Sequence, residues 1–341
     1  MQKSFLATAI GLAMVFQSGH ALAGKGLDAV KARGALICGV AAGGLAGFMM
    51  ADSQGKWKGL DVDVCRAVAA TIFGDSEKVK YVPLSAQQRF TALQSGEVDM
   101  LSNNTTWTLT RDSALGLDFT GVTYYDGQGF MVPKTLGVKS AKELAGATIC
   151  VPSGSTTELN IADYFRANKM SFKPVIIEDV DQIRAAFFSG RCDVYTGDRA
   201  RLFATRVANA PNPDNYVILP EIISKEPLGP VVRHGDNQFG DIVRWAQFAM
   251  IEAEEYGITS QNVDDMLKSD NPSIKRILGV TPGNGNALGV DEKWIYNIVK
   301  QVGNYGECFE RNLGTGSPLN IDRGLNKLWS QGGLQYAPPI R

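Results

Sequence analysis

The chain is poor in histidine and has no cysteines at metal-ligand spacing. Among its 341 residues only His20 and His234 are histidines, and its 5 cysteines form no CxxC motif and no cluster with histidine. This composition excludes a zinc site of the usual spacing. A Ser-His-Asp set, a Cys-His pair and a phosphate-binding loop are also missing. We therefore expect no metal, no cofactor and no catalytic residue.

An excess of charge of one sign is also lacking. The formal net charge is −1, and no basic tract interrupts the sequence, so we expect no nucleic-acid partner. Beyond the N-terminus, no stretch has the length and apolarity of a membrane span. With 44% hydrophobic and 20% charged residues, the composition is typical of a soluble globular protein.

The N-terminus has the pattern of a secretory signal peptide at residues 1–23. Lys3 supplies a positive charge, residues 5–16 are mostly apolar, and Ala21-Leu22-Ala23 is a small-x-small cleavage site. The alternative is a buried N-terminal helix, since the apolar run is too short to span a bilayer. Cleavage removes one of 34 Lys/Arg and none of 35 Asp/Glu, which leaves a net charge of 33 − 35 = −2. We expect an exported protein.

Two strand–helix blocks follow the signal peptide. Apolar runs and helical periodicity predict strands at 34–40, 79–84 and 98–101 with helices at 62–73 and 87–93. The pattern restarts with strands at 147–152, 173–177 and 192–196 and helices at 157–168 and 180–189. Each block is a βαβαβ unit, which predicts two α/β lobes, each with a parallel sheet flanked by helices.

Extended segments connect the blocks. Residues 124–132 are glycine-punctuated and suit a crossover, while 217–220 and 228–233 resemble a return crossing to the first lobe. Helices are predicted at 240–256 and 292–305, followed by a Gly/Pro-rich tail.

The five cysteines all follow the signal peptide. In an oxidising compartment, two disulfides and one free thiol is the simplest arrangement. The preferred pairs are Cys38 with Cys65 and Cys150 with Cys192, because each would join two elements of one lobe. The alternative is that some of these cysteines are small buried apolar residues.

Polar side chains follow the third predicted strand of the first lobe. The run from Ser102 to Asp112 contains Asn103, Asn104, Thr106 and Arg111. A loop after a strand that carries hydroxyl, amide and guanidinium side chains can bind a carboxylate, because Arg offers two parallel N–H donors. Alternatively, Arg111 pairs with Asp112 or caps a helix, and the two asparagines satisfy turn backbone.

The second block repeats this arrangement. Ser155 and Thr156 precede a predicted helix, and Asp198 follows the strand at 192–196. The carboxyl ends of parallel strands are where such sheets bind ligands. An arginine for a carboxylate and an acid for an ammonium predict a site for a free α-amino acid. Helix capping is the alternative role for Thr156 and Asp198.

The chain resembles the periplasmic solute-binding proteins of ABC-type amino-acid importers, family 3, and within them the general, broad-range L-amino-acid receptors. The resemblance is collinear over almost the whole mature chain, through 59–69, 83–99, 103–112, 121–130, 219–227 and 333–339. It implies a type II periplasmic-binding-protein fold, with lobe 1 at 24–126 and 227–341, lobe 2 at 127–226, and two hinge crossovers. It also implies a periplasmic, monomeric protein that binds L-amino acids and contacts an inner-membrane permease.

The resemblance assigns roles to individual residues. Arg111, helped by Thr106, Asn103 and Asn104, is expected at the ligand α-carboxylate, together with the backbone N–H of Thr156; Asp198 is expected at the α-ammonium. Leu45 stands where many relatives place an aromatic side chain over the ligand, which implies a roomier pocket here.

Two other functions remain open from the sequence. The same bilobal fold could carry a periplasmic enzyme of dehydratase type, with Glu158 as its carboxylate. A chemoreceptor partner that reports amino acids without transporting them would need the same pocket. The side-chain preference and the permease-contact surface are not predicted.

Overall fold

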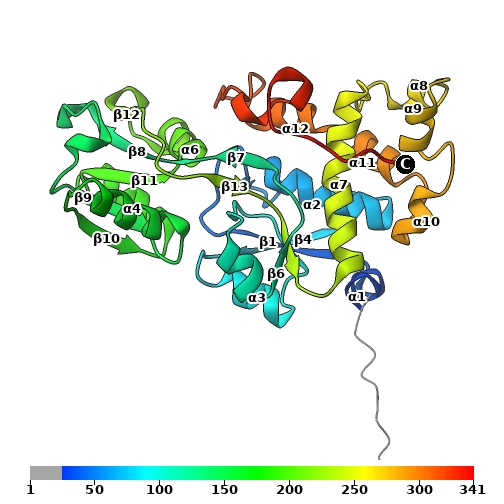
Figure 1. Ribbon diagram of the computed structural model, residues 1–341, viewed down its shortest axis with the longest axis horizontal. Coiled ribbons are helices and arrows are strands. Elements are labelled where there is room, and N and C mark those ends of the chain that lie inside the picture. Colours follow the sequence, from blue (N-terminus) through cyan, green and yellow to red (C-terminus); the bar gives the residue numbers. More distant parts are fainter. Residues whose placement is uncertain (1–24) are drawn as a thin grey trace, which may run out of the picture.

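Two five-stranded sheets form the two lobes of the molecule (Figure 1). The computed structural model describes residues 25–341, so the expected signal peptide lies outside the described residues. The first sheet has the order β4-β1-β5-β14-β6. Its strands are β1 (Leu36–Ala41), β4 (Val79–Leu84), β5 (Met100–Leu101), β6 (Leu117–Phe119) and β14 (Val231–Arg233).

The second sheet has the corresponding order β10-β9-β11-β8-β12. Its strands are β8 (Gln128–Pro133), β9 (Thr148–Pro152), β10 (Lys173–Ile177), β11 (Val194–Asp198) and β12 (Tyr216–Ile218). In each sheet one strand, β14 or β8, runs antiparallel to both its neighbours, and the other four share one direction. The predicted two-lobed, mostly parallel α/β fold is thus confirmed.

The central strands β1 and β9 bury apolar side chains on both faces of their sheets. In β1, Leu36 and Cys38 face the large core shared with the C-terminal helices, while Ile37 packs on the smaller core under α3 (Arg89–Ser95). In β9, Ile149 packs beside α4 (Thr156–Ala167) and Cys150 beside α5 (Val180–Phe188). Burial on both faces explains the nearly continuous apolar runs of these strands.

The remaining helices surround mainly the first sheet (Figure 1). They are α1 (Lys25–Arg33), α2 (Leu60–Phe73), α6 (Arg199–Asn209, in the second lobe), α7 (Asn237–Glu255), α8 (Val263–Met266), α9 (Pro272–Ile277), α10 (Asn284–Leu288), α11 (Trp294–Gln301) and α12 (Tyr305–Asn312). No helix among residues 25–341 is both long and apolar enough to cross a membrane.

The helix predicted at 292–305 is confirmed as α11, but its predicted C-terminal end is wrong. The helix ends at Gln301, Gly303 takes a positive φ of 98°, and Asn304 starts a separate helix, α12, with a capping box to Glu307. An Asn followed three residues later by Glu is a helix-start signal. The predicted end at 305 does not take this signal into account.

Two antiparallel crossover strands connect the lobes. They are β7 (Tyr124–Asp126) and β13 (Glu226–Leu228), which pair with each other so that Glu226 lies opposite Asp126. Both run between the lobes in Figure 1. The return crossing is shorter than predicted, since Val217 belongs to β12 and pairs with β8 in the second sheet. The exact lobe boundaries at 126/127 and 226/227 stay a prediction; the first coincides with the end of β7, and the second falls after the first residue of β13.

The structure contains both predicted disulfides. Cys38 of β1 pairs with Cys65 of α2, and Cys150 of β9 pairs with Cys192. Cys308 is a buried free thiol. Each disulfide connects two elements of the same lobe.

Candidate functional site

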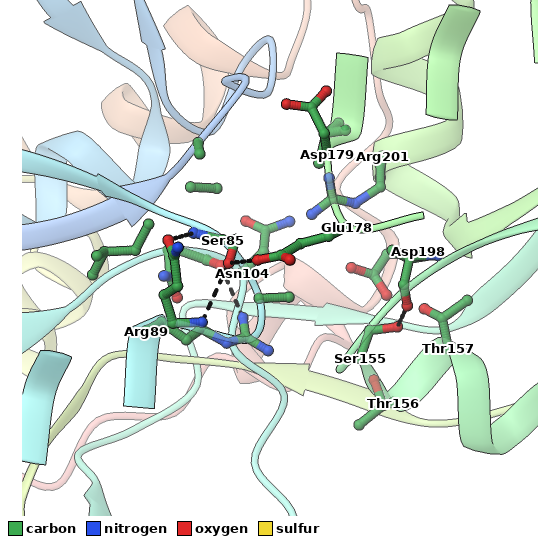
Figure 2. Close-up of a pocket in the computed structure, with 18 of the residues that line it drawn as sticks. Ser85, Arg89, Asn104, Ser155, Thr156, Thr157, Glu178, Asp179, Asp198 and Arg201 are labelled. Carbon is green, nitrogen blue, oxygen red and sulfur yellow. Dashed lines mark hydrogen bonds between the residues drawn. The ribbon is translucent and has the colours of Figure 1, made fainter. Parts of the chain in front are cut away.

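A cavity of about 470 Å³ lies between the two lobes. Its walls come from the carboxyl ends of parallel strands of both sheets, which is where sheets of this type bind ligands. The first lobe supplies Ala41, Ala42, Leu84, Ser85, Ala86, Gln88, Arg89, Asn103, Asn104 and Thr106, and the second supplies Pro152, Ser155, Thr156, Thr157, Glu178, Asp179, Val180, Gln182, Asp198 and Arg201. Figure 2 shows the two groups facing each other across the cavity.

The lobes are in contact around this cavity. The Ser85 hydroxyl donates to Glu178 at 2.6 Å, and the Arg184 guanidinium donates to the carbonyl oxygens of Gly43 and Gly44 at 3.0 and 2.7 Å. The side chain of Gln87 also donates to Ser153. Every one of these bonds joins one lobe to the other, so the structure represents a closed arrangement.

Asp61 holds the polar loop after β5 in place. The Asp61 carboxylate, in the first turn of α2, accepts from the Ser102 hydroxyl at 3.2 Å and from the Asn104 N–H at 3.1 Å. Burial raises the pKa of Asp61 to about 7. Asn104 takes a positive φ of 53°, a conformation that Asn tolerates better than most residues.

The asparagines of this loop differ in their bonding. The side-chain oxygen of Asn103 accepts from the Thr105 hydroxyl at 2.5 Å. Both polar atoms of the Asn104 side chain are buried and have no partner among the described residues. Because buried polar groups are nearly always hydrogen-bonded, Asn104 is available to a ligand in the cavity.

Arg111 lies next to the cavity-lining residue Thr106. It sits on a short π-helix, Thr110–Ala114, and its guanidinium donates to the Thr106 carbonyl at 2.9 Å and lies 5.1 Å from the Phe90 ring centre. Burial lowers the pKa of Arg111, while the negative charges of Glu226 and Asp198 oppose that shift. The structure therefore places Arg111 next to Thr106, outside the set of cavity-lining residues.

Arg89, at the start of α3, lines the cavity directly. It is 6% exposed, and its Nε atom has no hydrogen-bond partner in the described part of the chain. Its other contacts are long, at 3.5 Å to the Asn103 carbonyl and 3.4 Å to the Thr105 hydroxyl. Burial lowers the pKa of Arg89 well below its usual value, and the nearby cations Arg111 and Arg201 lower it further. A buried guanidinium without an anion is a strong indication of an anionic ligand group.

Thr156 and Thr106 face each other from different lobes. Their hydroxyl oxygens are 3.3 Å apart, and each hydroxyl donates to the carboxylate of Glu226. Ser155 directly precedes Thr156 at the start of α4, and its hydroxyl donates to the Pro152 carbonyl at 2.6 Å. The N-terminus of α4, with its free N–H groups, therefore opens into the cavity and favours a negative ligand group.

Asp198 ends β11 and precedes α6 without capping that helix. The N–H of Ala200 is capped instead by Asp126 of the crossover strand β7, at 3.0 Å. Burial raises the pKa of Asp198 to about 6, and the charge of Arg201 opposes this shift. Because Asp126 takes the capping role, the Asp198 carboxylate is left for the cavity.

Six of the seven site residues expected from the sequence line this one cavity: Asn103, Asn104, Thr106, Ser155, Thr156 and Asp198. The seventh, Arg111, contacts the cavity-lining residue Thr106 through its carbonyl oxygen. Ser85, Arg89, Glu178, Asp179 and Arg201 also line the cavity but were not among the expected site residues; for Arg89, contact with an acidic ligand side chain and a surface position were both open from the sequence. The first four follow the carboxyl ends of β4 and β10, so applying the strand-end rule to every strand would have found them.

Other residues considered from the sequence lie elsewhere. Leu45 is buried in the core of the first lobe. Glu158, the carboxylate considered for an enzyme, accepts from the Gly154 N–H and does not line the cavity. Among residues 25–341, no group of His, Cys, Asp and Glu side chains is arranged to hold a metal ion.

Comparison with known proteins identifies the class. Residues 36–262 match the family of bacterial extracellular solute-binding proteins, family 3, and the chain belongs to this family. It is 57% identical, over the full length of both chains, to the general L-amino acid-binding periplasmic protein AapJ of Rhizobium johnstonii. It is 54% identical, again over both full lengths, to the glutamate/glutamine/aspartate/asparagine-binding protein BztA of Rhodobacter capsulatus.

A solved structure supports the same assignment. An ABC transporter periplasmic binding protein from Brucella ovis with glutathione bound is 58% identical to this chain and superimposes with a TM-score of 0.90. The match covers 92% of this chain and 99% of that chain.

Proposed function

We propose that the protein is the extracytoplasmic receptor of an ABC importer and that it binds a broad range of free L-amino acids. The observation that carries the proposal is the pairing of buried charges across one interlobe cavity. The first lobe supplies Arg89, which lines the cavity, and Arg111, which lies next to Thr106. The second lobe supplies Asp198. A carboxylate and an ammonium on one small molecule would complement both sides.

The same charges explain how ligand and closure are coupled. Among residues 25–341, the buried guanidinium of Arg89 and the buried carboxylate of Asp198 each form no ion pair in the closed protein, which is unfavourable. A bound amino acid supplies both counter-ions at once. Since the two groups belong to different lobes, the ligand shifts the population towards the closed state.

The relatives support the range of ligands. Their names specify general L-amino acids in one case and glutamate, glutamine, aspartate and asparagine in another. The cavity volume of about 470 Å³ lies within the range of about 300–1,000 Å³ found for small-molecule sites and leaves room for long side chains. We further propose a periplasmic, monomeric protein that delivers its ligand to an inner-membrane permease.

The test is isothermal titration calorimetry on mature protein that has been unfolded and refolded to remove carried ligand. The panel contains L-glutamate, L-glutamine, L-alanine, L-leucine and L-histidine, with succinate as a control without an ammonium group. Binding of several amino acids in the micromolar range or tighter, with none for succinate, is expected. Binding of succinate alone would contradict the assignment of Asp198.

The alternative is a dehydratase-like enzyme on the same fold. Glu158, its candidate carboxylate, is not at the cavity, and the relatives are named as binding proteins. We therefore propose that the protein is not an enzyme. Incubation of each bound ligand with the protein, followed by mass spectrometry, should return the ligand unchanged.

A further inference from the structure

Glu226 is a buried carboxylate that lies directly behind the candidate site. It is 1% exposed and is the first residue of the crossover strand β13. One carboxylate oxygen accepts from the Thr106 hydroxyl at 2.5 Å and from the Thr156 hydroxyl at 3.0 Å. The other accepts from the Asn160 side-chain amide and the Ser224 hydroxyl, each at 2.7 Å.

This bonding fixes the direction of both threonine hydroxyls. An ionised carboxylate only accepts hydrogen bonds, and a hydroxyl has a single hydrogen to donate. When Thr106 and Thr156 both donate to Glu226, neither has a hydrogen left for the cavity. Their oxygens then present only lone pairs to the cavity that they line.

The two hydroxyl oxygens are also unusually placed relative to each other. They are 3.3 Å apart, and with both hydrogens directed at Glu226 no hydrogen lies between them. Two lone-pair-bearing oxygens at that separation repel each other weakly and attract a donor that touches both. The carboxylate of Asp198, on the same side of the cavity as Thr156 in Figure 2, adds a third acceptor.

We propose that Glu226 is a positioning residue that makes Thr106 and Thr156 hydrogen-bond acceptors and thereby builds, with Asp198, a three-acceptor site for a primary ammonium. This rests on the proposed function, because it concerns how an α-amino acid is held. A primary ammonium has three N–H donors, one for each acceptor. The Thr106 hydroxyl is accordingly assigned to the ligand α-ammonium, whereas the family resemblance implies a role for Thr106 at the α-carboxylate.

The position of Glu226 on the crossover connects this site to lobe closure. Thr106 is tied to β13 through a bridge with Leu228 and through the Trp107 N–H, which donates to the Pro227 carbonyl at 2.9 Å. Thr156 and Asn160 belong to α4 of the other lobe. Thr106 and Thr156 therefore reach the same Glu226 carboxylate oxygen from different lobes.

The test compares two substitutions of Glu226. Glu226→Gln can keep a carbonyl oxygen towards the threonines, because the Asn160 amide can turn and the Ser224 hydroxyl can accept. Glu226→Met has a similar length but no acceptor, so the threonine hydrogens are free to turn into the cavity. Circular dichroism and thermal unfolding establish that each variant folds.

The measured quantity is the ratio of Kd for an N-methyl amino acid to Kd for the parent amino acid, obtained by calorimetry with L-glutamate and L-glutamine and their N-methyl derivatives. N-methylation leaves two N–H donors. Wild type is expected to prefer the parent compounds, and Glu226→Met is expected to reduce the ratio by about tenfold, the typical loss of one hydrogen bond to a charged group. Glu226→Gln should keep the wild-type ratio.

A second pair of variants keeps the test independent of Glu226 itself. Thr156→Val removes one acceptor and should lower the ratio as Glu226→Met does, whereas Thr156→Ser retains the hydroxyl and should not. If Glu226→Met weakens all four ligands equally, Glu226 is merely structural and the inference is wrong. An equal fall of the ratio in Glu226→Gln would also contradict the inference. In that case the charge of residue 226, and not the direction of the threonine hydroxyls, would determine the preference for a primary ammonium. If wild type binds none of the parent amino acids, it is the proposed function that fails.

Discussion

Replacing Asp198 by Asn should weaken ligand binding and stabilise the empty protein at the same time. Asn has nearly the same shape but no charge, so it cannot pair with an ammonium. Truncating one partner of a buried charge pair typically costs about 2–5 kcal/mol, or roughly 30-fold to several thousandfold in Kd. The affinity for L-glutamate or L-glutamine should fall accordingly.

The stability change follows from the pKa. Burial raises the pKa of Asp198 from 3.8 to about 6. At neutral pH, ionisation of this side chain therefore costs more free energy in the folded protein than in the unfolded chain. A shift of about two units corresponds to about 3 kcal/mol. Asn removes this cost, and the free energy of unfolding of the ligand-free variant should increase by about 1–3 kcal/mol at pH 7.5.

The pH dependence has a definite sign. Because the folded pKa is raised, the cost of ionisation is present above pH 6 and disappears as the pH falls from about 6 to 4. The stability advantage of Asp198→Asn should therefore be large at pH 7.5 and small at pH 4.5. Urea unfolding at both pH values measures the stability, and calorimetry at pH 7.5 measures the affinity.

An exposed aspartate provides the matched control. Asp163 lies on α4 with 73% of its side chain exposed and pairs only with Arg166, so Asp163→Asn should change neither affinity nor stability by more than about 0.5 kcal/mol. A variant Asp198→Asn that binds amino acids like wild type, or that is less stable than wild type at pH 7.5, would refute the reasoning.

Three further predictions concern neighbouring features. For wild type, Kd for L-glutamine should rise by up to about tenfold per pH unit below pH 6, as Asp198 with its pKa of about 6 is protonated; calorimetry across pH 4.5–8 with a constant Kd would contradict this. Arg89→Met should raise Kd for L-glutamate and for L-alanine alike by about tenfold or more, measured by calorimetry, because the guanidinium lines the cavity without a bonded anion among the described residues and both ligands carry the α-carboxylate; unchanged affinities would argue against direct contact. Replacing Cys150 and Cys192 by Ala should lower the free energy of unfolding by about 2–4 kcal/mol in urea, as expected for a loop of this length, and thiol titration of denatured wild type should give one free thiol, Cys308.

The order of strands and helices could be read from the sequence because local patterns specify them. The runs at 79–84 and 173–177 match β4 and β10 residue for residue. The disulfides were also predictable once the strands and helices were placed, since a strand and the helix packed on it bring Cys38 close to Cys65. Where the prediction did not take a helix cap into account, as at Asn304, the predicted helix end was wrong.

The candidate site was predictable as far as it lies at strand ends. Polar runs after β5, β9 and β11 were recognised, and their residues meet in one cavity. The role of Arg89 was not, because an arginine at the start of a helix is usually exposed, and only packing against Phe90 and the β5 loop buries it. Its burial depends on residues distant in the sequence.

By itself, the sequence determined the two α/β lobes and the chemical types of several polar residues that line the cavity, because periodicity and strand-end polarity are local properties. Only the tertiary structure decided which groups share a hydrogen bond or a counter-ion. Asp126 caps α6 and so releases Asp198, while Glu226 takes the hydrogens of Thr106 and Thr156. These pairings join segments from different lobes and both crossovers. Hydrogen-bond direction and desolvation depend on distances in space, which no local sequence pattern encodes.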